Sequence, residues 1–419
     1  MAQHEVRAGS LPASDGAWTE VGASGEAAVS GWVEPGWEPV RAAFQRNFDR
    51  HREVGAGFSV WHRGRPVAEL WGGMADPVTG RRWTVDTPAV VFSATKGLVA
   101  IRLLQLTDAG VLDLDAPIAD VWPEFAAAGK ERITARTLLN HRSGLNALDA
   151  ALELSDFADP GGRVHEALVA QRPLWAPGTG QGYCGVTYGP YAGELVYRTT
   201  GQRIGAGFQQ HIAEPLGLDA WIGAPPDVAA RAARILPVGP REILRHHLPS
   251  ALFRRTPEGR LARQIARPGS VPRRVFGSPR MTSLGQVNDP AVMALELPWM
   301  GAVASAAALA KAYAGLIGEV DGVRLVRPEA LRPLRYRQSW STRDRVLQKP
   351  MGWSQGFLKD RRHLFSPNAA SFGHAGAGGA VGWADAEAEL AFAYVPNRMD
   401  WQIRSPRSVH LAHSVYACL

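Results

Sequence analysis

Short apolar segments near the two ends of the chain restrict its possible folds more than any other feature. Phe58–His62 and Val67–Trp71 are separated by the turn Arg63–Pro66, a pattern typical of an antiparallel hairpin. Three more strand-like segments, separated by Gly-rich or acidic turns, lie in the last quarter of the chain: Ala370–His374, Ala380–Trp383 and Leu390–Val395. The stretch between the two groups has helical patterns. We therefore expect an α+β fold, an α/β sandwich in which one antiparallel sheet from both chain ends packs against a helical region.

Apolar periodicity and end signals predict the helices of the middle region and one at the C-terminal end. Gly110 and Gly201 follow two of these helices, as expected where a helix ends. The predicted helices are Thr95–Ala109, Thr134–Asn140, Thr187–Thr200, Ala302–Ile317 and Ser405–Tyr416. No repeat or low-complexity linker divides the chain. We expect one domain over residues 36–419, preceded by a flexible leader over residues 1–35 that lacks the apolar run of a signal peptide.

The formal net charge of +7 comes largely from one segment of the chain. Residues 231–280 contain 12 arginines against Glu242 and Glu258, and several prolines interrupt them. The segment has two aromatic residues and no zinc-ligand or helix-turn-helix pattern, so we expect no nucleic-acid partner. We interpret the region around residues 230–285 as a variable, solvated basic insertion. The alternative is a rim that attracts an acidic substrate.

Composition and spacing also argue against several other classes of protein. No apolar run reaches the length of about 18 residues that a transmembrane helix needs, so no membrane partner is expected. Cys184 and Cys418 are too few for a disulfide scaffold, which favours a cytoplasmic location. Gly378-Gly379 precedes strands and not a helix, which is unlike a dinucleotide-binding loop. Two histidine pairs lack convergent cysteines or carboxylates, so we expect neither a metal nor a cofactor: His246 with His247, and His410 with His413.

One of the few lysines follows a serine by three residues at a predicted helix start. Only five of the 46 basic residues are lysines, and Lys96 lies one helical turn after Ser93. Arginine keeps its proton in proteins, whereas a desolvated lysine loses it readily. The Ser-x-x-Lys spacing therefore puts a potential base beside a potential nucleophile, in the positive field of a helix N-terminus. A capping serine with an exposed lysine is the alternative interpretation of these two residues.

The sequence around this pair resembles a known family. Val90–Gly97 is similar to the first motif of serine β-lactamases and penicillin-binding proteins, and most similar to the class C branch and the family VIII carboxylesterases. Three further segments resemble later motifs of that family in the expected order: Thr137–Leu145, Pro177-Gly178 with Tyr183-Cys184-Gly185, and Phe372–Gly379. The resemblance covers most of the span from Phe58 to Arg398. It implies a β-lactamase-like fold for this chain.

The same resemblance implies roles for individual residues. Ser93 would attack an acyl carbon and form an acyl-enzyme, while Lys96 and Tyr183 share its proton. Which of these two is the general base stays open at this point. The backbone N–H groups of Ser93 and Ala377 would form the oxyanion hole. We expect His141 to be a structural residue that fixes a turn.

Two departures from the lactamase pattern bear on the substrate. Gly185 stands where lactamases have the asparagine of Tyr-x-Asn, and His374-Ala375-Gly376 stands where they have Lys-Thr-Gly. A histidine that is mostly neutral near pH 7 thus replaces a permanent cation. We predict substrate-binding roles for His374, Gly376 and Gly185, and a neutral ester or amide as the substrate. Trp175, Trp221 and Trp353 are candidates for the substrate-facing walls.

These features favour a carboxylesterase that acts on small or medium acyl esters. The alternatives on the same site are an acyltransferase, like the lovastatin-type transferases of this superfamily, and an amide hydrolase. A binding protein without turnover is disfavoured, since it would need no intact Ser93, Lys96 and Tyr183. Gly352–Gly356 spells the Gly-x-Ser-x-Gly nucleophile elbow, but its flanks lack the required strand and helix, so we expect Ser354 in a strand of the sheet. Cys184 lacks a positioned base and is not expected to be a nucleophile.

Overall fold

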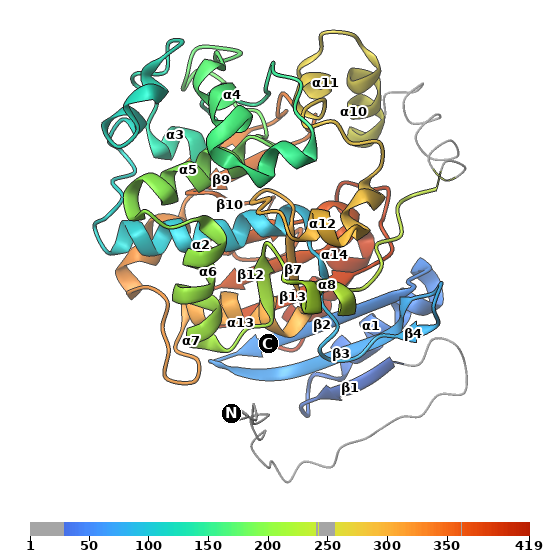
Figure 1. Cartoon of the computed structure of the whole chain (residues 1–419). Helices are drawn as coiled ribbons and strands as arrows, with labels where there is room; N and C mark the ends of the chain where they lie inside the picture. Colours follow the sequence, from blue (N-terminus) through green and yellow to red (C-terminus); the bar gives the residue numbers. More distant parts are fainter. Residues whose placement is uncertain (1–28, 240–241, 243–255, 362) are drawn as a thin grey trace, which may run out of the picture.

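The computed structural model describes residues 29–239, 242, 256–361 and 363–419. Its centre is a ten-stranded antiparallel sheet in the order β1-β3-β2-β13-β12-β11-β10-β9-β8, with β4 paired to β3 (Figure 1). These strands are β1 (Val29–Val33), β2 (Gly55–His62), β3 (Arg65–Asp76), β4 (Arg81–Arg82), β8 (Ser339–Ser341), β9 (Met351–Ser354), β10 (Phe357–Leu358), β11 (Phe372–Ala375), β12 (Val381–Asp385) and β13 (Leu390–Pro396).

The two chain ends meet in the middle of this sheet, as the sequence predicted. β13 pairs with β2 in antiparallel register from Leu390↔His62 to Pro396↔Ala56. All seven residues of β13 are buried, and successive side chains point to opposite faces. Phe392 and Tyr394 therefore join one core, and Ala391 and Ala393 join the other. A strand buried on both faces requires a layer of helices on each side, so the predicted α/β sandwich is confirmed.

The helices cover both faces of the sheet. α13 packs against β2, β12 and β13 on one face, while α1 and α14 pack together in the core of the other face. Figure 1 shows α3, α4 and α5 gathered at the end of the molecule opposite β1 and β3. The α-helices are α1 (Glu38–His51), α2 (Thr95–Asp108), α3 (Ala135–Leu139), α4 (His165–Ala170), α5 (Tyr188–Thr200), α6 (Ile204–Phe208), α7 (Glu214–Leu216), α8 (Pro226–Arg231), α10 (Pro257–Ala266), α11 (Val271–Val275), α12 (Pro290–Met293), α13 (Ala306–Ile317) and α14 (Pro406–Tyr416).

Short helical turns and a second small sheet connect these elements. The small sheet has the order β5-β7-β6, with β5 (Ala89–Val90), β6 (Ala220–Ile222) and β7 (Ala302–Ala304). The 3₁₀ turns are η1 (Phe92–Ala94), η2 (Ile118–Asp120), η3 (Pro123–Ala126), η4 (Leu154–Ala158), η7 (Leu284–Asn288), η8 (Pro328–Arg335) and η9 (Ala377–Gly379), and two π-helical turns are η5 (Pro160–Val164) and η6 (Gln209–Ala213).

The structure corrects two sequence-based boundaries. Residues 29–33 belong to the sheet, since Val29 pairs with Gly72 and Val33 with Ala68, so the predicted leader boundary at residue 35 is wrong. Residues 1–28 lie outside the described residues. The predicted helix over 302–317 is divided into β7 and α13, because Ser305 caps α13 by accepting a hydrogen bond from the Ala308 N–H (3.1 Å). The alanine-rich composition of β7 resembles that of a helix, so the strand was missed. The capping Ser305 could have indicated where the helix begins.

The basic insertion is described in part. His246 and His247 lie outside the described residues, as do residues 240–241 and 243–255. Two of its arginines are paired within the chain: Arg231 with Asp219 at 2.5 Å and Arg274 with Asp149 at 2.6 Å. In the described part of the chain, no helix is long and apolar enough to cross a membrane.

Candidate active site

Ser93 is held at a sharp turn between the small sheet and helix α2. β5 leads into η1, where Phe92 has a φ of 48°, a left-handed conformation that is unusual for a side chain of this size. Backbone and side-chain bonds fix this turn on β7, since Ala302 O accepts from the Val91 N–H (2.9 Å) and the Ala302 N–H donates to Thr95 Oγ1 (3.0 Å). Strained turns held by their surroundings are common at functional sites.

Lys96 lies one turn beyond Ser93 and is fully buried. Its Nζ is 3.2 Å from Ser93 Oγ, 2.8 Å from Gly185 O and 2.7 Å from Trp299 O. Burial lowers the pKa of Lys96 well below its ordinary value, because the charged form loses hydration. A neutral amine has two N–H groups, which the two carbonyls accept. Its lone pair then faces the Ser93 hydroxyl.

Tyr183 completes the group of three predicted side chains. Its ring lies parallel to Trp353 with centroids 5.5 Å apart, and Lys96 Nζ is 5.1 Å from its centroid. Burial raises the pKa of Tyr183, and a hydrogen bond with the Ser93 side chain opposes that rise in part. The phenol therefore keeps its proton near neutral pH and is a hydrogen-bond donor there.

Two buried side chains hold the backbone of the Tyr183 segment. The Cys184 N–H donates to His141 Nδ1 at 3.0 Å, which requires an unprotonated Nδ1. Burial, with a smaller contribution from Lys96, lowers the pKa of His141 well below its usual value and keeps the ring neutral. The Tyr183 N–H donates to Asp344 Oδ1 at 3.1 Å. The structural role predicted for His141 is confirmed.

Asp344 was missed by the sequence analysis. It is fully buried, and its Oδ1 also accepts from the N–H groups of Val346 and Leu347 at 2.9 Å each. An aspartate that accepts bonds from the next residues looks in sequence like any turn residue. What distinguishes Asp344 from other aspartates in turns is its hydrogen bond with the N–H of Tyr183, a residue 161 positions away in the sequence.

The loop after β11 brings Ala377 to the same cleft as Ser93. A Cβ on Gly376 would lie 2.2 Å from Val91 O, so only glycine lets the end of β11 approach the turn that carries Ser93. Gly378 O accepts bonds from Arg407 Nη2 and from the Asp400 N–H, both at 3.1 Å. Gly376 thus lets the backbone of the loop approach the turn that carries Ser93. The hydrogen bonds from Arg407 and Asp400 hold the loop in place.

His374 lines the cleft as a neutral side chain. Its Nδ1 lies 3.0 Å from Ala375 O, and a carbonyl only accepts, so Nδ1 carries the proton. Nε2 is then an acceptor, and it is without a hydrogen-bond partner among the described residues. Burial and the nearby Lys96 lower the pKa of His374 well below its ordinary value.

Gly185 lies behind the cleft wall and not in it. It is buried, and its carbonyl accepts from Lys96. A Cβ at this position would lie 2.9 Å from the ring of Phe276, which lines the cleft. Phe276 therefore occupies the space into which a side chain at position 185 would project. This arrangement corrects the prediction that Gly185 contacts substrate.

The cleft above Ser93 has a volume of about 800 Å³, enough for a small-molecule substrate. Tyr183, His374 and Ala377 line it with Ser93. Most of the remaining wall is apolar, and its larger members are Phe276, Leu284, Leu347, Met351, Trp353, Met399, Trp401 and Ile403. Of the three predicted tryptophans only Trp353 is among the lining residues, and Trp401 was missed. The basic insertion supplies part of the wall through Pro237–Gly239 and Phe276.

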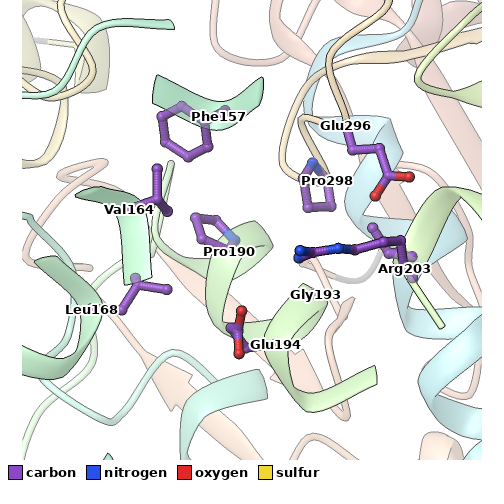
Figure 2. Close-up of a pocket in the computed structure, with 10 residues that line it drawn as sticks. Phe157, Val164, Leu168, Pro190, Gly193, Glu194, Arg203, Glu296 and Pro298 are labelled. Carbon is purple, nitrogen blue, oxygen red and sulfur yellow. The ribbon is translucent and has the colours of Figure 1, made fainter. Parts of the chain in front are cut away.

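A small cavity is lined by residues of η4, η5, α4, α5 and α6 and by Glu296 and Pro298. Figure 2 shows Phe157, Val164 and Leu168 on one side of it and Pro298 on the other. Its volume is about 40 Å³, which is too small for a substrate molecule, and Ser93 does not line it. Of these two cavities, only the large cleft, which Ser93 lines, is a candidate substrate site.

Other sequence patterns prove structural. Ser354 lies in β9 and donates to Pro333 O at 3.2 Å, and β10 follows in place of the helix that a nucleophile elbow needs. Burial raises the pKa of Cys184 to about 12, so its thiol stays protonated. His413 Nε2 lies 3.0 Å from His363 O. Among the residues that the structure describes, no three His, Cys, Asp or Glu side chains group as metal ligands.

A sheet from both chain ends, with a Ser-x-x-Lys pair at the start of the helix behind it, defines the class of β-lactamase-like serine enzymes. The profile of the family described as Beta-lactamase matches residues 40–414, and the chain belongs to the beta-lactamase family.

Three similar proteins illustrate the range of this family. "Esterase/beta-lactamase LipL" of Mycobacterium tuberculosis (strain ATCC 25618 / H37Rv) is 32% identical over 378 residues, which are 88% of this chain and 83% of that protein. A crystal structure of a family VIII carboxylesterase has a TM-score of 0.82 and 33% identity, covering 94% of this chain and 100% of that one. "Monacolin J acid methylbutanoyltransferase" of Aspergillus terreus is 32% identical over 172 residues, 36% of this chain and 42% of that protein.

Proposed function

We propose that this protein is a carboxylesterase that cleaves small or medium acyl esters through an acyl-enzyme on Ser93. The observation that carries the proposal is the setting of Lys96. Its Nζ is 3.2 Å from Ser93 Oγ, and both N–H groups of its neutral form have carbonyl partners. A fully buried amine in this arrangement has its lone pair available to the serine proton. The two esterases among the similar proteins support the same activity.

Acylation begins when Ser93 Oγ attacks the ester carbonyl and its proton passes to Lys96. The backbone N–H groups of Ser93 and Ala377 stabilise the oxyanion, a contribution of about 10²–10³ in rate for each donor. Tyr183 donates its phenolic proton to the departing alkoxide. We assign the base to Lys96 and the acid to Tyr183 because burial favours the neutral form of each.

Deacylation restores the first protonation states: Ser93 regains its proton from Lys96, and Tyr183 takes a new proton from water. The Tyr183 phenolate takes a proton from water, and the resulting hydroxide attacks the acyl carbon. Ser93 Oγ then leaves and recovers its proton from Lys96. The enzyme ends with neutral Lys96, protonated Tyr183 and a free carboxylic acid product, so protons and charges balance over the cycle.

The cleft favours neutral, largely apolar esters. His374 stays neutral where the lactamase motif has a cation, so it offers no positive charge to a substrate carboxylate. Arg404 also lines the cleft, but its Nε is bonded to Asp360 at 2.7 Å, which offsets its charge. Phe276 and Trp401 add apolar wall. Such a cleft offers little attraction to a carboxylate-bearing β-lactam.

Transfer of the acyl group to an alcohol or amine is the second candidate function, and amide hydrolysis is the third. The similarity to the Aspergillus methylbutanoyltransferase favours transfer over part of the chain. Product analysis with butyl alcohol added to a 4-nitrophenyl ester reaction separates transfer from hydrolysis. Butyl ester as the main product would favour the transferase, and free acid would favour the esterase.

The direct test is hydrolysis of 4-nitrophenyl butyrate by the unmodified protein and by Ser93→Ala. We expect activity in the first and a loss of at least about a thousandfold in the second. Ser354→Ala is the matched control and should retain activity. Intact-protein mass spectrometry should detect a butyryl adduct on the unmodified enzyme and none on Ser93→Ala. Equal rates for both would disprove the assignment.

Other expectations from the sequence stay predictions. These are a single domain, a cytoplasmic location, and the absence of a nucleic-acid partner. Salt-insensitive, negligible binding to duplex DNA would agree with the last of them.

A further inference from the structure

A polar groove lies at the edge of the sheet, outside the cleft that holds Ser93. It is open, has a volume of about 430 Å³, and is formed by β8, the segment 179–181 and the segment that follows β8. Arg142, Arg343 and Arg345 all line it. Its wall is mostly polar, in contrast to the apolar wall of the cleft that holds Ser93.

The three arginines of this groove have no acidic partner. Within the described part of the chain, none of their guanidinium groups lies within 4.0 Å of a carboxylate oxygen. Some of the arginines elsewhere do have one. Examples are Arg404 with Asp360 at 2.7 Å and Arg407 with Glu53 at 2.7 Å.

The contacts that these arginines do make are neutral. Arg142 donates to Gly178 O, and Arg343 Nε donates to Gln348 Oε1 at 3.0 Å. The guanidinium of Arg345 lies 4.6 Å from the ring of Trp175. Such contacts orient the three side chains but leave their charges uncompensated.

The nearest acidic residue in the sequence is turned away from the groove. Asp344 lies between Arg343 and Arg345, but it is fully buried and does not line the groove. Its Oδ1 is occupied by backbone N–H groups, including that of Tyr183. The groove therefore combines three positive charges with a wall that carries no carboxylate among its lining residues.

We propose that this groove binds the phosphate group of a small molecule. The planar guanidinium fork matches phosphate and carboxylate oxygens, and paired bonds of this type are the strong ones in proteins. Three forks reach the groove from two places in the chain, Arg142 and the pair Arg343 and Arg345. A phosphate offers three or more acceptor oxygens and can engage all three, whereas a carboxylate offers two. The site is separate from the proposed esterase activity and does not depend on it.

Binding is expected to stabilise the fold, because the groove joins segments that are distant in sequence. The Arg345 N–H donates to Gln181 O at 3.2 Å, and Gln181 Nε2 donates to Met351 O at 3.0 Å. A ligand bound by both Arg142 and Arg345 would add a further link between the segments that carry these two arginines. A ligand that binds only the folded state adds RT ln(1 + [L]/Kd) to the free energy of unfolding, so Tm rises as the ligand concentration increases.

The test is titration calorimetry of the full chain with inorganic phosphate and with pyrophosphate, at an ionic strength held constant with chloride. We expect saturable binding at one site and a rise in Tm. Arg343→Gln with Arg345→Gln should weaken the affinity at least about tenfold. Arg63→Gln with Arg332→Gln removes the same charge from side chains that are 71% and 76% exposed elsewhere, and should bind normally.

Three results would overturn the proposal. These are no saturable binding of either phosphate, an equal loss of affinity in the control double variant, and binding of citrate without binding of phosphate. Arg343→Gln alone, a change at an exposed side chain, serves if the double variant does not fold. A loss of affinity in that single variant, with unchanged circular dichroism, supports the site.

Discussion

Two of the buried lysines of this protein have no exposed surface, and only one of these two has the arrangement for catalysis. Lys96 at the start of α2 and Lys130 in the loop before α3 are both fully buried. Each donates to two backbone carbonyls: Gly185 O and Trp299 O for Lys96, and Val169 O and Gln171 O for Lys130.

The difference between the two lysines is their third neighbour. Burial lowers the pKa of both lysines, to about 8 for Lys130 and well below the ordinary value for Lys96. The third contact of Lys130 is the face of Phe125, 5.4 Å from Nζ to the ring centroid, whereas Lys96 has the Ser93 hydroxyl at 3.2 Å. A lowered pKa is therefore no sign of catalysis by itself. The chemistry depends on what the lone pair faces.

The largest expected effect comes from replacing each lysine in turn. Lys96→Met should reduce kcat/KM for 4-nitrophenyl butyrate by at least about a thousandfold, because the serine loses its base. Lys130→Met should stay within about tenfold of the unmodified enzyme. Steady-state kinetics on the two purified variants checks both. Similar losses in both variants would mean that Lys96 acts through the fold and not as a base.

The next comparison uses two buried tyrosines beside the same histidine. The rings of Tyr183 and Tyr188 lie 5.2 and 5.6 Å from that of His141. Tyr183→Phe should lower kcat about 10²–10³-fold with little change in KM, because it removes the proposed acid. Tyr188→Phe, which removes a weak contact at 3.5 Å to Lys96 O, should change kcat less than about fivefold. Equal effects would contradict the role given to Tyr183.

The pH dependence of kcat/KM tests the protonation states directly. Lys96 has to be neutral to act as base, so activity should rise with pH through its lowered pKa and then level off. Burial raises the pKa of Tyr183, so no decline is expected until well into the alkaline range. The neutral His141 and His374 add no further titration near pH 7. A rate that falls between about pH 6 and 9, the reverse of a lysine losing its proton, would contradict these assignments.

A smaller effect is expected from the cleft wall. Phe276→Ala opens the space beside Gly185 and should raise kcat/KM for 4-nitrophenyl octanoate relative to the acetate by about tenfold. Tyr336→Ala removes another aromatic side chain, 72% exposed and absent from the cleft lining, and is the control. An unchanged ratio in Phe276→Ala would remove Phe276 from the specificity wall.

The smallest effect concerns stability and returns to Lys130. Its pKa is about 8 in the folded state and near 10.5 when unfolded, so the unfolded chain binds more protons between these values. The free energy of unfolding should therefore rise with pH over that interval, by at most about 1.4 kcal/mol per pH unit from this group. Lys130→Met should flatten this rise. Urea denaturation at pH 8 and pH 10 measures it, and identical slopes for both proteins would contradict the lowered pKa.

Local patterns in the sequence predicted much of the fold correctly. The hairpin, the helix after Ser93 and the strands near the C-terminal end were confirmed, because period-2 and period-3.6 patterns report which faces are buried. Errors fell where local signals conflict with packing. β7 resembles the helix that follows it, and β1 is short, contains Gly31 and gains its strand character only by pairing with β3.

For the active site, the sequence by itself determined the pairing of Ser93 with Lys96, because three residues along a helix always bring two side chains to one face. Resemblance to the family added Tyr183 and Ala377. Only the tertiary structure decided what surrounds them. The carbonyl partners of Lys96 lie 89 and 203 residues away, and Asp344 lies 161 residues from Tyr183. Phe276 in the space beside Gly185 is likewise a non-local contact. Such contacts carry no local periodicity, so the burial that lowers the pKa of Lys96 and the wall that shapes the cleft arise only when distant segments pack together.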